Sequence, residues 1–175
     1  MKNVTLFLFC AALFLPAIVF PSCAGGAPAR EGGASVQEGA SAQGGGAVFS
    51  DVEGKEWVLL ELKSAGQTVA MDRQKLEADS MGGVYTISFQ EGRVSGMGAP
   101  NRYFGPYTLD NSRTLSIGNL ASTMMMAFRE PDGLKENEYF AYLSKVTRWD
   151  LREGKLELYS SDGSGAEAVL VFVRK

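Results

Sequence analysis

Few side chains in this sequence could carry covalent or acid–base chemistry. It has no histidine, and both of its cysteines fall within the first 23 residues. This excludes Cys–His and Ser–His nucleophile systems and the usual zinc ligands from the rest of the chain. A glycosidase-like pair of carboxylates is one hypothesis. Because most charged side chains are solvated, we favour exposed turns and strand ends for them, and we expect no enzyme activity, metal or cofactor. The carboxylates concerned are Asp72, Glu77 and Asp79, and separately Asp150 and Glu153.

A second group of residues follows a glycine-rich segment. Gly96 and Gly98 precede Asn101, but the third glycine and the helix of a dinucleotide-binding fingerprint are absent. The glycines predict a sharp turn or bulge that Asn101 closes through its side chain. The alternative is a recognition patch, since loops often carry function. Its candidate residues are Asn101, Arg102, Tyr103, Tyr107, Thr123 and Met124.

Three consecutive methionines, Met124 to Met126, offer soft thioether ligands of the kind that bind copper. In an extended strand the first and third would share one face, and the second would take the other. We favour filling of the core, because methionine adapts to irregular gaps. A flexible apolar ligand pocket is the next interpretation.

Cys23 is the remaining candidate for chemistry, and it stands at the end of an apolar leader. Residues 4–20 form an apolar stretch after a weakly basic start, which is the order of a secretory signal. The segment 20–23 resembles a bacterial lipobox. Ser22 fits this motif well, whereas the two residues before it depart from the usual Leu-Ala pair. The pattern predicts that Cys23 becomes a lipidated first residue.

The leader also allows two other interpretations. One is ordinary signal-peptide cleavage after Ala24 or Ala27, without a lipid. The other is a strained transmembrane helix, shorter than the usual span of about 20 residues. We expect a signal peptide over residues 1–22. Residues 23–50 would hold the lipidated cysteine and a flexible tether, because Gly, Ala and Ser offer too little apolar surface to offset the entropy of ordering. Residues 51–175 suffice for one domain.

The charge balance limits the partners. A net charge of −3 disfavours nucleic acid and anionic lipid surfaces. We expect contact with a membrane through the lipid anchor, and either an envelope protein or a small apolar ligand as partner. Because Ala24 rather than Asp follows the cysteine, the expected location is the bacterial envelope at its outer membrane.

The folded part reads mainly as strands. Alternating or continuous apolar residues predict strands at Trp57–Lys63, Val84–Phe89, Arg113–Ile117, Lys155–Tyr159 and Ala168–Val173. Trp149 begins a further strand. For residues 70–76 both a short strand and a short helix remain open.

One helix is predicted after Asp132, its expected cap. Its apolar stripe consists of Tyr139, Phe140, Leu143 and Val146, and its solvent side of Lys135, Glu136, Glu138 and Lys145. Antiparallel strands with short turns and one late helix predict a mainly β fold. We expect a small antiparallel barrel or strongly curved sheet, with a lipocalin-like topology as one option and the helix packed on the sheet.

The order of several short motifs resembles the META domain family, which includes small heat-inducible lipoproteins of the bacterial envelope. The motifs are Trp57-Val58-Leu59, Val94-Ser95-Gly96, Gly98, Asn101, Tyr103, Gly105-Pro106-Tyr107, Leu115-Ser116-Ile117, Thr123 to Ala127 and Leu156-Glu157-Leu158. The resemblance covers about residues 54–175. It implies a non-enzymatic role in binding or envelope maintenance, with a link to stress. The alternative is a carrier that holds a small apolar ligand inside a barrel.

The chain departs from this family at two positions. Members often carry two cysteines that look like a disulfide pair, where this chain has Pro100 and Phe128. A disulfide contributes about 2–4 kcal/mol by constraining the unfolded chain. Our hypothesis is that apolar burial of Phe128 and restriction of the loop by Pro100 offset part of this difference.

Overall fold

The computed structural model describes residues 47–110, 112–127 and 129–175. The expected signal peptide, Cys23, most of the tether and Phe128 therefore lie outside the described residues. The chain divides into two units, Met1–Ala42 and Gln43–Lys175, and the second contains all of the described residues. In the part of the chain that the structure describes, no helix is both long enough and apolar enough to cross a membrane.

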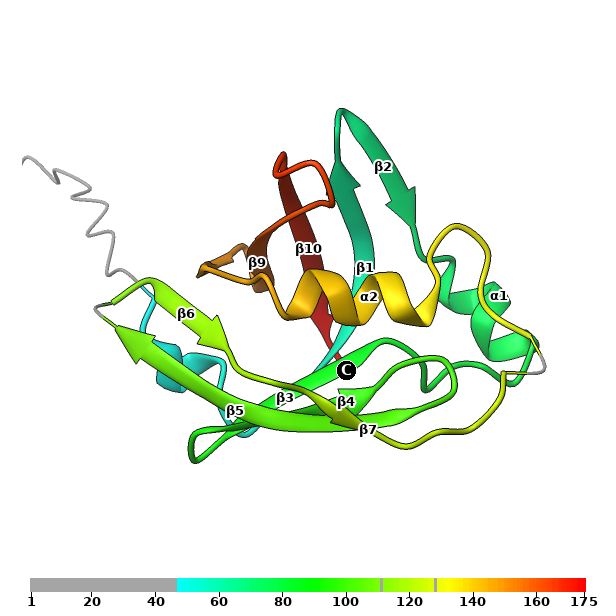
Figure 1. Cartoon of the computed structure of the whole chain (residues 1–175), viewed down its shortest axis with the longest axis horizontal. Coiled ribbons are helices and arrows are strands. Elements are labelled where there is room, and N and C mark those ends of the chain that lie inside the picture. Colours follow the sequence, from blue (N-terminus) through cyan, green and yellow to red (C-terminus); the bar gives the residue numbers. More distant parts are fainter. Residues whose placement is uncertain (1–46, 111, 128) are drawn as a thin grey trace, which may run out of the picture. The chain divides into compact units, whose positions relative to one another are not determined.

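Eight antiparallel strands of this unit close into a barrel (Figure 1). They are β1 (Glu56–Ser64), β3 (Thr86–Gln90), β4 (Arg93–Met97), β5 (Arg102–Asp110), β6 (Thr114–Ile117), β8 (Arg148–Arg152), β9 (Lys155–Ser161) and β10 (Glu167–Arg174). Each pairs with the next in this order, and the β10–β1 pairing closes the ring. The predicted fold class, a mainly β protein with a small antiparallel barrel, is confirmed.

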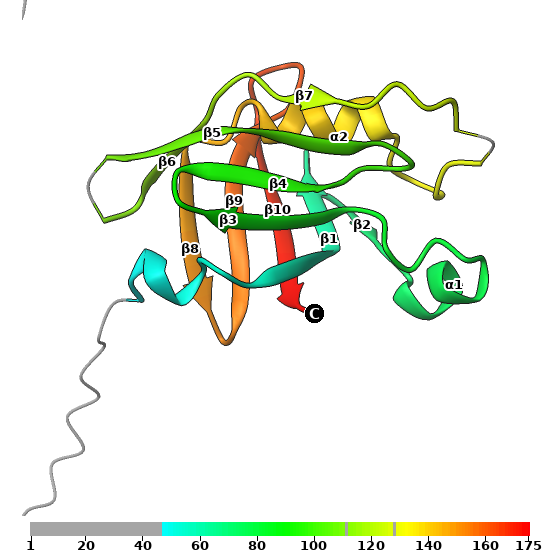
Figure 2. The same ribbon diagram turned by 90° about the horizontal axis from the view of Figure 1, so that it is seen from below.

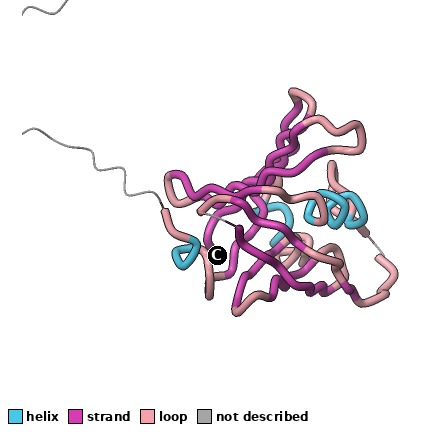
Figure 3. Tube along the Cα trace, turned by 60° about the vertical axis from the view of Figure 1, so that its left-hand side comes forward, coloured by secondary structure: helices cyan, strands magenta, loops and turns pink. Residues whose placement is uncertain are grey.

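Two short strands flank the barrel. β2 (Gln67–Ala70) pairs with β1, and β7 (Ala121–Ser122) pairs with β5. Figure 3, in which strands are magenta, shows that strands make up most of the folded unit. Local sequence patterns predicted most of these strands. The long strand β5, which follows the glycine-rich turn, was not among the predicted strands.

The described residues include three helical segments. η1 (Phe49–Asp51) is a single 3-10 turn, α1 (Arg73–Ala78) is short, and α2 (Glu136–Leu143) is the predicted helix. The ambiguous residues 70–76 hold the end of β2 and the start of α1, so the structure has a short helix there in addition to the expected one. A single sequence pattern could not resolve this segment, because strand and helix meet within it.

The apolar stripe of α2 is confirmed, but two details of the helix are wrong. Tyr139 and Leu143 are buried. The residue at the N-terminal cap is Lys135, and Asp132 instead forms an ion pair with Lys75 on α1, at 2.8 Å. Glu136 does not face solvent on the outer side of the helix. Its carboxylate turns toward the loop before β5, where it accepts backbone hydrogen bonds.

Aromatic side chains fill the barrel from both ends. α2 and η1 lie at opposite ends (Figure 2). Under α2, the ring of Tyr139 lies 5.0 Å from that of Tyr85. At the other end, Phe49 of η1 packs against Phe89 and Trp149 with ring centroids at 5.3 and 4.9 Å. Phe49 belongs to the expected tether, yet it completes the core, and an eight-stranded barrel is just narrow enough for side chains to fill it.

Candidate functional site

Asn101 lies in the loop between β4 and β5 and is only 6% exposed. Its Oδ1 accepts hydrogen bonds from the Thr123 hydroxyl at 2.8 Å and the Met125 N–H at 2.6 Å. Its Nδ2 donates to the Met125 carbonyl at 3.1 Å and to Glu136 Oε2 at 2.6 Å. Two accepted and two donated bonds use the full capacity of a carboxamide. The buried amide therefore joins three segments that are distant in sequence.

The prediction that Asn101 closes its own turn through its side chain is wrong. The Asn101 carbonyl closes that turn by accepting from the Gly98 N–H, at 2.6 Å. Because the backbone performs this task, the side chain is free to reach the segment after β7.

Glu136, on the first turn of α2, binds Asn101 and the loop that contains it. Its Oε1 accepts from the backbone N–H groups of Ala99 and Asn101, both at 2.6 Å. Gly98 leaves the necessary space, since a Cβ there would come within 2.5 Å of the same oxygen. Hydrogen bonds to an ionised acceptor are roughly twice as strong as neutral ones. We call Asn101 and Glu136 the amide clamp.

The clamp holds residues 123–127, which we call the methionine loop. Met124, Met125 and Met126 are 99%, 60% and 96% exposed. The interpretation that these side chains fill the core is therefore wrong, and none of the three lies inside the barrel. The clamp binds the backbone of Met125 and leaves the side chains outside. The loop thus presents consecutive apolar thioethers to solvent in a fixed backbone conformation.

A groove on the outer face of β3, β4 and β5 begins where the methionine loop starts. Its volume is about 610 Å³. Arg102 on β5 lines it and forms two hydrogen bonds with Thr123: its carbonyl accepts from the Thr123 N–H, and its own N–H donates to the Thr123 hydroxyl. Phe104, 50% exposed, points outward from the same strand. The small residues Ser88 and Ser95 stand in register with Phe104 and keep the groove open.

The structure divides the recognition patch that the sequence predicts. Arg102, Thr123 and Met124 lie at the surface above the buried Asn101. Tyr103 and Tyr107 point into the barrel and are 1% and 7% exposed. Whether the surface members bind anything stays a prediction.

Sequence reasoning missed Phe104 and Glu136 as members of this region. The period-two alternation of β5 was the signal for Phe104, since its neighbours Tyr103 and Gly105 are buried. Glu136 had no such signal, because its role depends on a loop that is distant in sequence.

Buried tyrosines beneath the clamp form a hydrogen-bonded group. Tyr103 donates to the Thr86 carbonyl at 2.8 Å, and its oxygen lies 3.1 Å from that of Tyr139. Tyr85 donates to the Leu134 carbonyl at 2.5 Å. Burial raises the pKa of Tyr85, Tyr103 and Tyr139 above the ordinary value. These phenols are therefore protonated near neutral pH and serve as structural donors.

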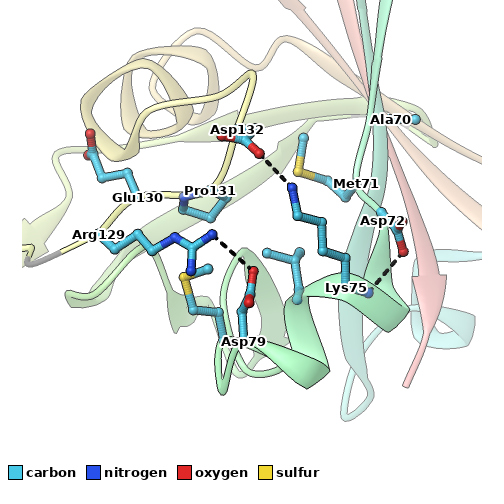
Figure 4. A pocket seen from close by; sticks show the side chains of 11 residues that line it. Ala70, Met71, Asp72, Lys75, Asp79, Arg129, Glu130, Pro131 and Asp132 are labelled. Carbon is cyan, nitrogen blue, oxygen red and sulfur yellow. Dashed lines mark hydrogen bonds and ion pairs between the residues drawn. The ribbon is translucent and has the colours of Figure 1, made fainter.

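A small cavity of about 80 Å³ lies between α1 and residues 129–132 (Figure 4). Two ion pairs at the surface span it, Lys75 with Asp132 at 2.8 Å and Arg129 with Asp79 at 3.3 Å. Surface pairs of this kind contribute little to stability, because water and salt screen them. They nevertheless hold residues 129–132, which follow the methionine loop in sequence, against α1.

Of the five carboxylates singled out in the sequence, Asp72, Asp79 and Asp150 have structural partners, whereas Glu77 and Glu153 are exposed. Asp72 caps α1 by accepting from the Lys75 N–H at 3.0 Å. Asp150 forms ion pairs with Arg113 and Arg152 at 2.8 and 2.7 Å. These neighbours lower the pKa of Asp150 against the opposing effect of its burial. Carboxylates held in caps and ion pairs are poorly placed for general acid catalysis.

The fold and this region define a small, side-chain-filled β-barrel whose exposed features are an apolar loop and a groove. The META domain family model matches residues 50–175. The chain therefore belongs to the META domain family. This membership and the barrel fold support a non-catalytic domain.

The solved structures that are similar to this chain include the following two. The NMR structure of a protein from Burkholderia xenovorans is 25% identical, with a TM-score of 0.54, and the match covers 73% of this chain and 86% of that one. The crystal structure of a DUF4847 family protein from Bacteroides vulgatus is 14% identical, with a TM-score of 0.47 and coverage of 71% and 95%. No curated protein matches the chain.

Proposed function

We propose that this protein is a non-enzymatic lipoprotein of the bacterial envelope that binds a protein partner through its methionine loop. Lipidation of Cys23, an outer-membrane location and a role in envelope maintenance under stress are parts of the same proposal. The apolar leader and Ser22 directly before Cys23 support the anchor. Membership of the META domain family supports the absence of catalysis.

The observation that carries the proposal is the exposure of Met124 and Met126 on a backbone that a buried clamp holds. Burying one such side chain in a complex contributes about 1.5–3 kcal/mol. Methionine, arginine and aromatic residues are also enriched in the cores of protein interfaces. Arg102 and Phe104, which line the groove beside the loop, supply the arginine and the aromatic residue. Because hydrogen bonds already hold the backbone of the loop at Met125, binding needs little further ordering of the backbone there, and the main entropic cost is about 0.5–1.5 kcal/mol for each methionine side chain that is immobilised.

The groove indicates the chemistry of the partner. The guanidinium of Arg93 lies over the Phe104 ring, 5.3 Å from its centroid. No carboxylate of the described residues forms an ion pair with Arg93 or Arg102. Lys175, which also lines the groove, is paired with Glu56 at 3.0 Å. An extended segment that carries apolar and acidic side chains would complement Arg102 in the groove and Arg93 over the Phe104 ring beside it. We therefore take such a segment of an envelope protein as the partner.

Site-specific photocrosslinking in intact cells tests this proposal. A photoreactive residue at Phe104 or Met126 is expected to give one discrete protein adduct. The same residue at Ala166, exposed in the turn between β9 and β10, is the control and should give none. Met124→Gln and Met126→Gln together should abolish the adduct at position 104 while the purified variant melts like the wild type. Equal adducts at positions 104 and 166 would refute a specific surface.

The second candidate function, carriage of a small apolar ligand, has less support. It requires a hollow barrel, whereas aromatic rings from both ends occupy the interior of the described barrel. Native mass spectrometry of protein purified from cells separates the two functions. A stoichiometric apolar molecule that co-purifies would favour the carrier.

A further inference from the structure

The methionines of the described residues fall into two groups by exposure. Met71 is 4% exposed, and Met81 and Met97 are partly buried. Met124 and Met126, in contrast, are almost completely exposed, and Met125 between them is 60% exposed. The chain therefore contains its own comparison between protected and unprotected thioethers, with the unprotected ones in the loop that the amide clamp holds.

We propose that Met124 and Met126 are an oxidative modification site for hypohalous acids. A thioether sulfur attacks the oxidant and takes up its oxygen. With hypochlorous acid the new S–O bond replaces the O–Cl bond, the sulfur is oxidised by two electrons, and chloride and a proton leave. The product is methionine sulfoxide, which is polar and which methionine sulfoxide reductases can reduce. The reaction needs only access of the oxidant to the sulfur, which the exposure of both side chains provides.

The arrangement of the clamp confines the effect of oxidation to the surface. The amide of Asn101 binds the N–H and carbonyl of Met125, and no sulfur takes part in these bonds. A sulfoxide at Met124 or Met126 therefore leaves the clamp and the core intact. It replaces apolar surface by a strong dipole at the loop. This second step, loss of partner binding on oxidation, rests on the proposed function, whereas the selectivity of the modification does not.

The first arm of the test uses purified full-length protein treated with less than stoichiometric hypochlorous acid. Peptide mass spectrometry should show Met124 and Met126 gaining oxygen at least about tenfold faster than Met71. The melting temperature should stay that of untreated protein. Equal rates at Met71, or a melting temperature that falls in step with oxidation of the loop, would overturn the proposal.

The second arm measures the crosslink from position 104 after oxidation. The wild type should lose the adduct and regain it after treatment with sulfoxide reductases. A variant with Met124→Leu, Met125→Leu and Met126→Leu keeps an apolar loop without thioethers and should retain its adduct under the same oxidant. An adduct that survives oxidation of the wild type would overturn the switch. If no adduct forms under any condition, the proposed function is wrong. The relative oxidation rates measured in the first arm still test whether Met124 and Met126 are the modification site.

Discussion

Asn101 holds Met125 by both of its backbone groups. Its Oδ1 accepts from the Met125 N–H at 2.6 Å, and its Nδ2 donates to the Met125 carbonyl at 3.1 Å. The carboxamide thus takes the place that a neighbouring strand would occupy beside the loop. As a result, a loop with three exposed apolar side chains has a defined backbone shape.

Asn101→Ala tests how much this clamp stabilises the fold. The change leaves buried polar groups without partners, and each such group costs about 1–3 kcal/mol. We expect the free energy of unfolding to fall by about 2–4 kcal/mol in urea denaturation. Asn119→Ala, at an exposed position between β6 and β7, is the control and should change it by less than about 0.5 kcal/mol. Equal effects of the two changes would show that the clamp contributes nothing.

Gly96→Ala should disrupt the tyrosine group. A Cβ at Gly96 would collide with the Thr86 carbonyl oxygen and lie 2.7 Å from the Tyr103 hydroxyl oxygen. Overpacking of a core costs about 1–3 kcal/mol, and the hydrogen bond of Tyr103 would also be lost. Thermal unfolding of Gly96→Ala and Gly163→Ala compares a crowded glycine with an open one. A Cβ at Gly163 would meet no atom within 4 Å, so a similar loss of stability in both variants would contradict the packing argument.

The tyrosines predict a loss of stability in alkali. Burial, with the neighbouring Glu53, raises the pKa of Tyr107 to about 12, and burial raises the pKa of Tyr85 and Tyr139 further. A phenol whose pKa is higher in the folded state stabilises the fold fully below the unfolded value of about 10. This stabilisation is lost as the pH rises from about 10 through the folded values. Denaturant midpoints measured from about pH 8 to pH 12, with tyrosinate absorbance, should fall above about pH 10. A constant midpoint would contradict the burial of these phenols.

Cys23→Ser tests the lipid anchor that the leader predicts. We expect the variant to be released from the membrane or to remain unprocessed, because a serine cannot form the thioether that attaches the lipid. Fractionation of cells and mass spectrometry of the mature N-terminus would detect either outcome. Circular dichroism of the purified variant should match the wild type, since the barrel comprises residues beyond Phe49. A normally cleaved variant that still fractionates with the membrane would refute the anchor.

The sequence by itself determined the class of fold and most of the strands. Period-two alternation, as in Tyr85, Ile87 and Phe89, reflects burial of one face, and all three side chains are in fact fully buried. The stripe of α2 was readable for the same reason, since Tyr139 and Leu143 lie one turn apart. The order of the short motifs also indicated the family, which the match over residues 50–175 confirms.

Only the tertiary structure decided how the candidate site is built. Met124 to Met126 looked like core residues by composition, but their burial depended on where their backbone found hydrogen-bond partners. Asn101, which Glu136 holds in place, supplies those partners for Met125, and the three methionine side chains stay outside. Barrel closure likewise turned Tyr103 inward and Phe104 outward. Such choices depend on contacts between segments far apart in the chain, and local periodicity carries no information about them.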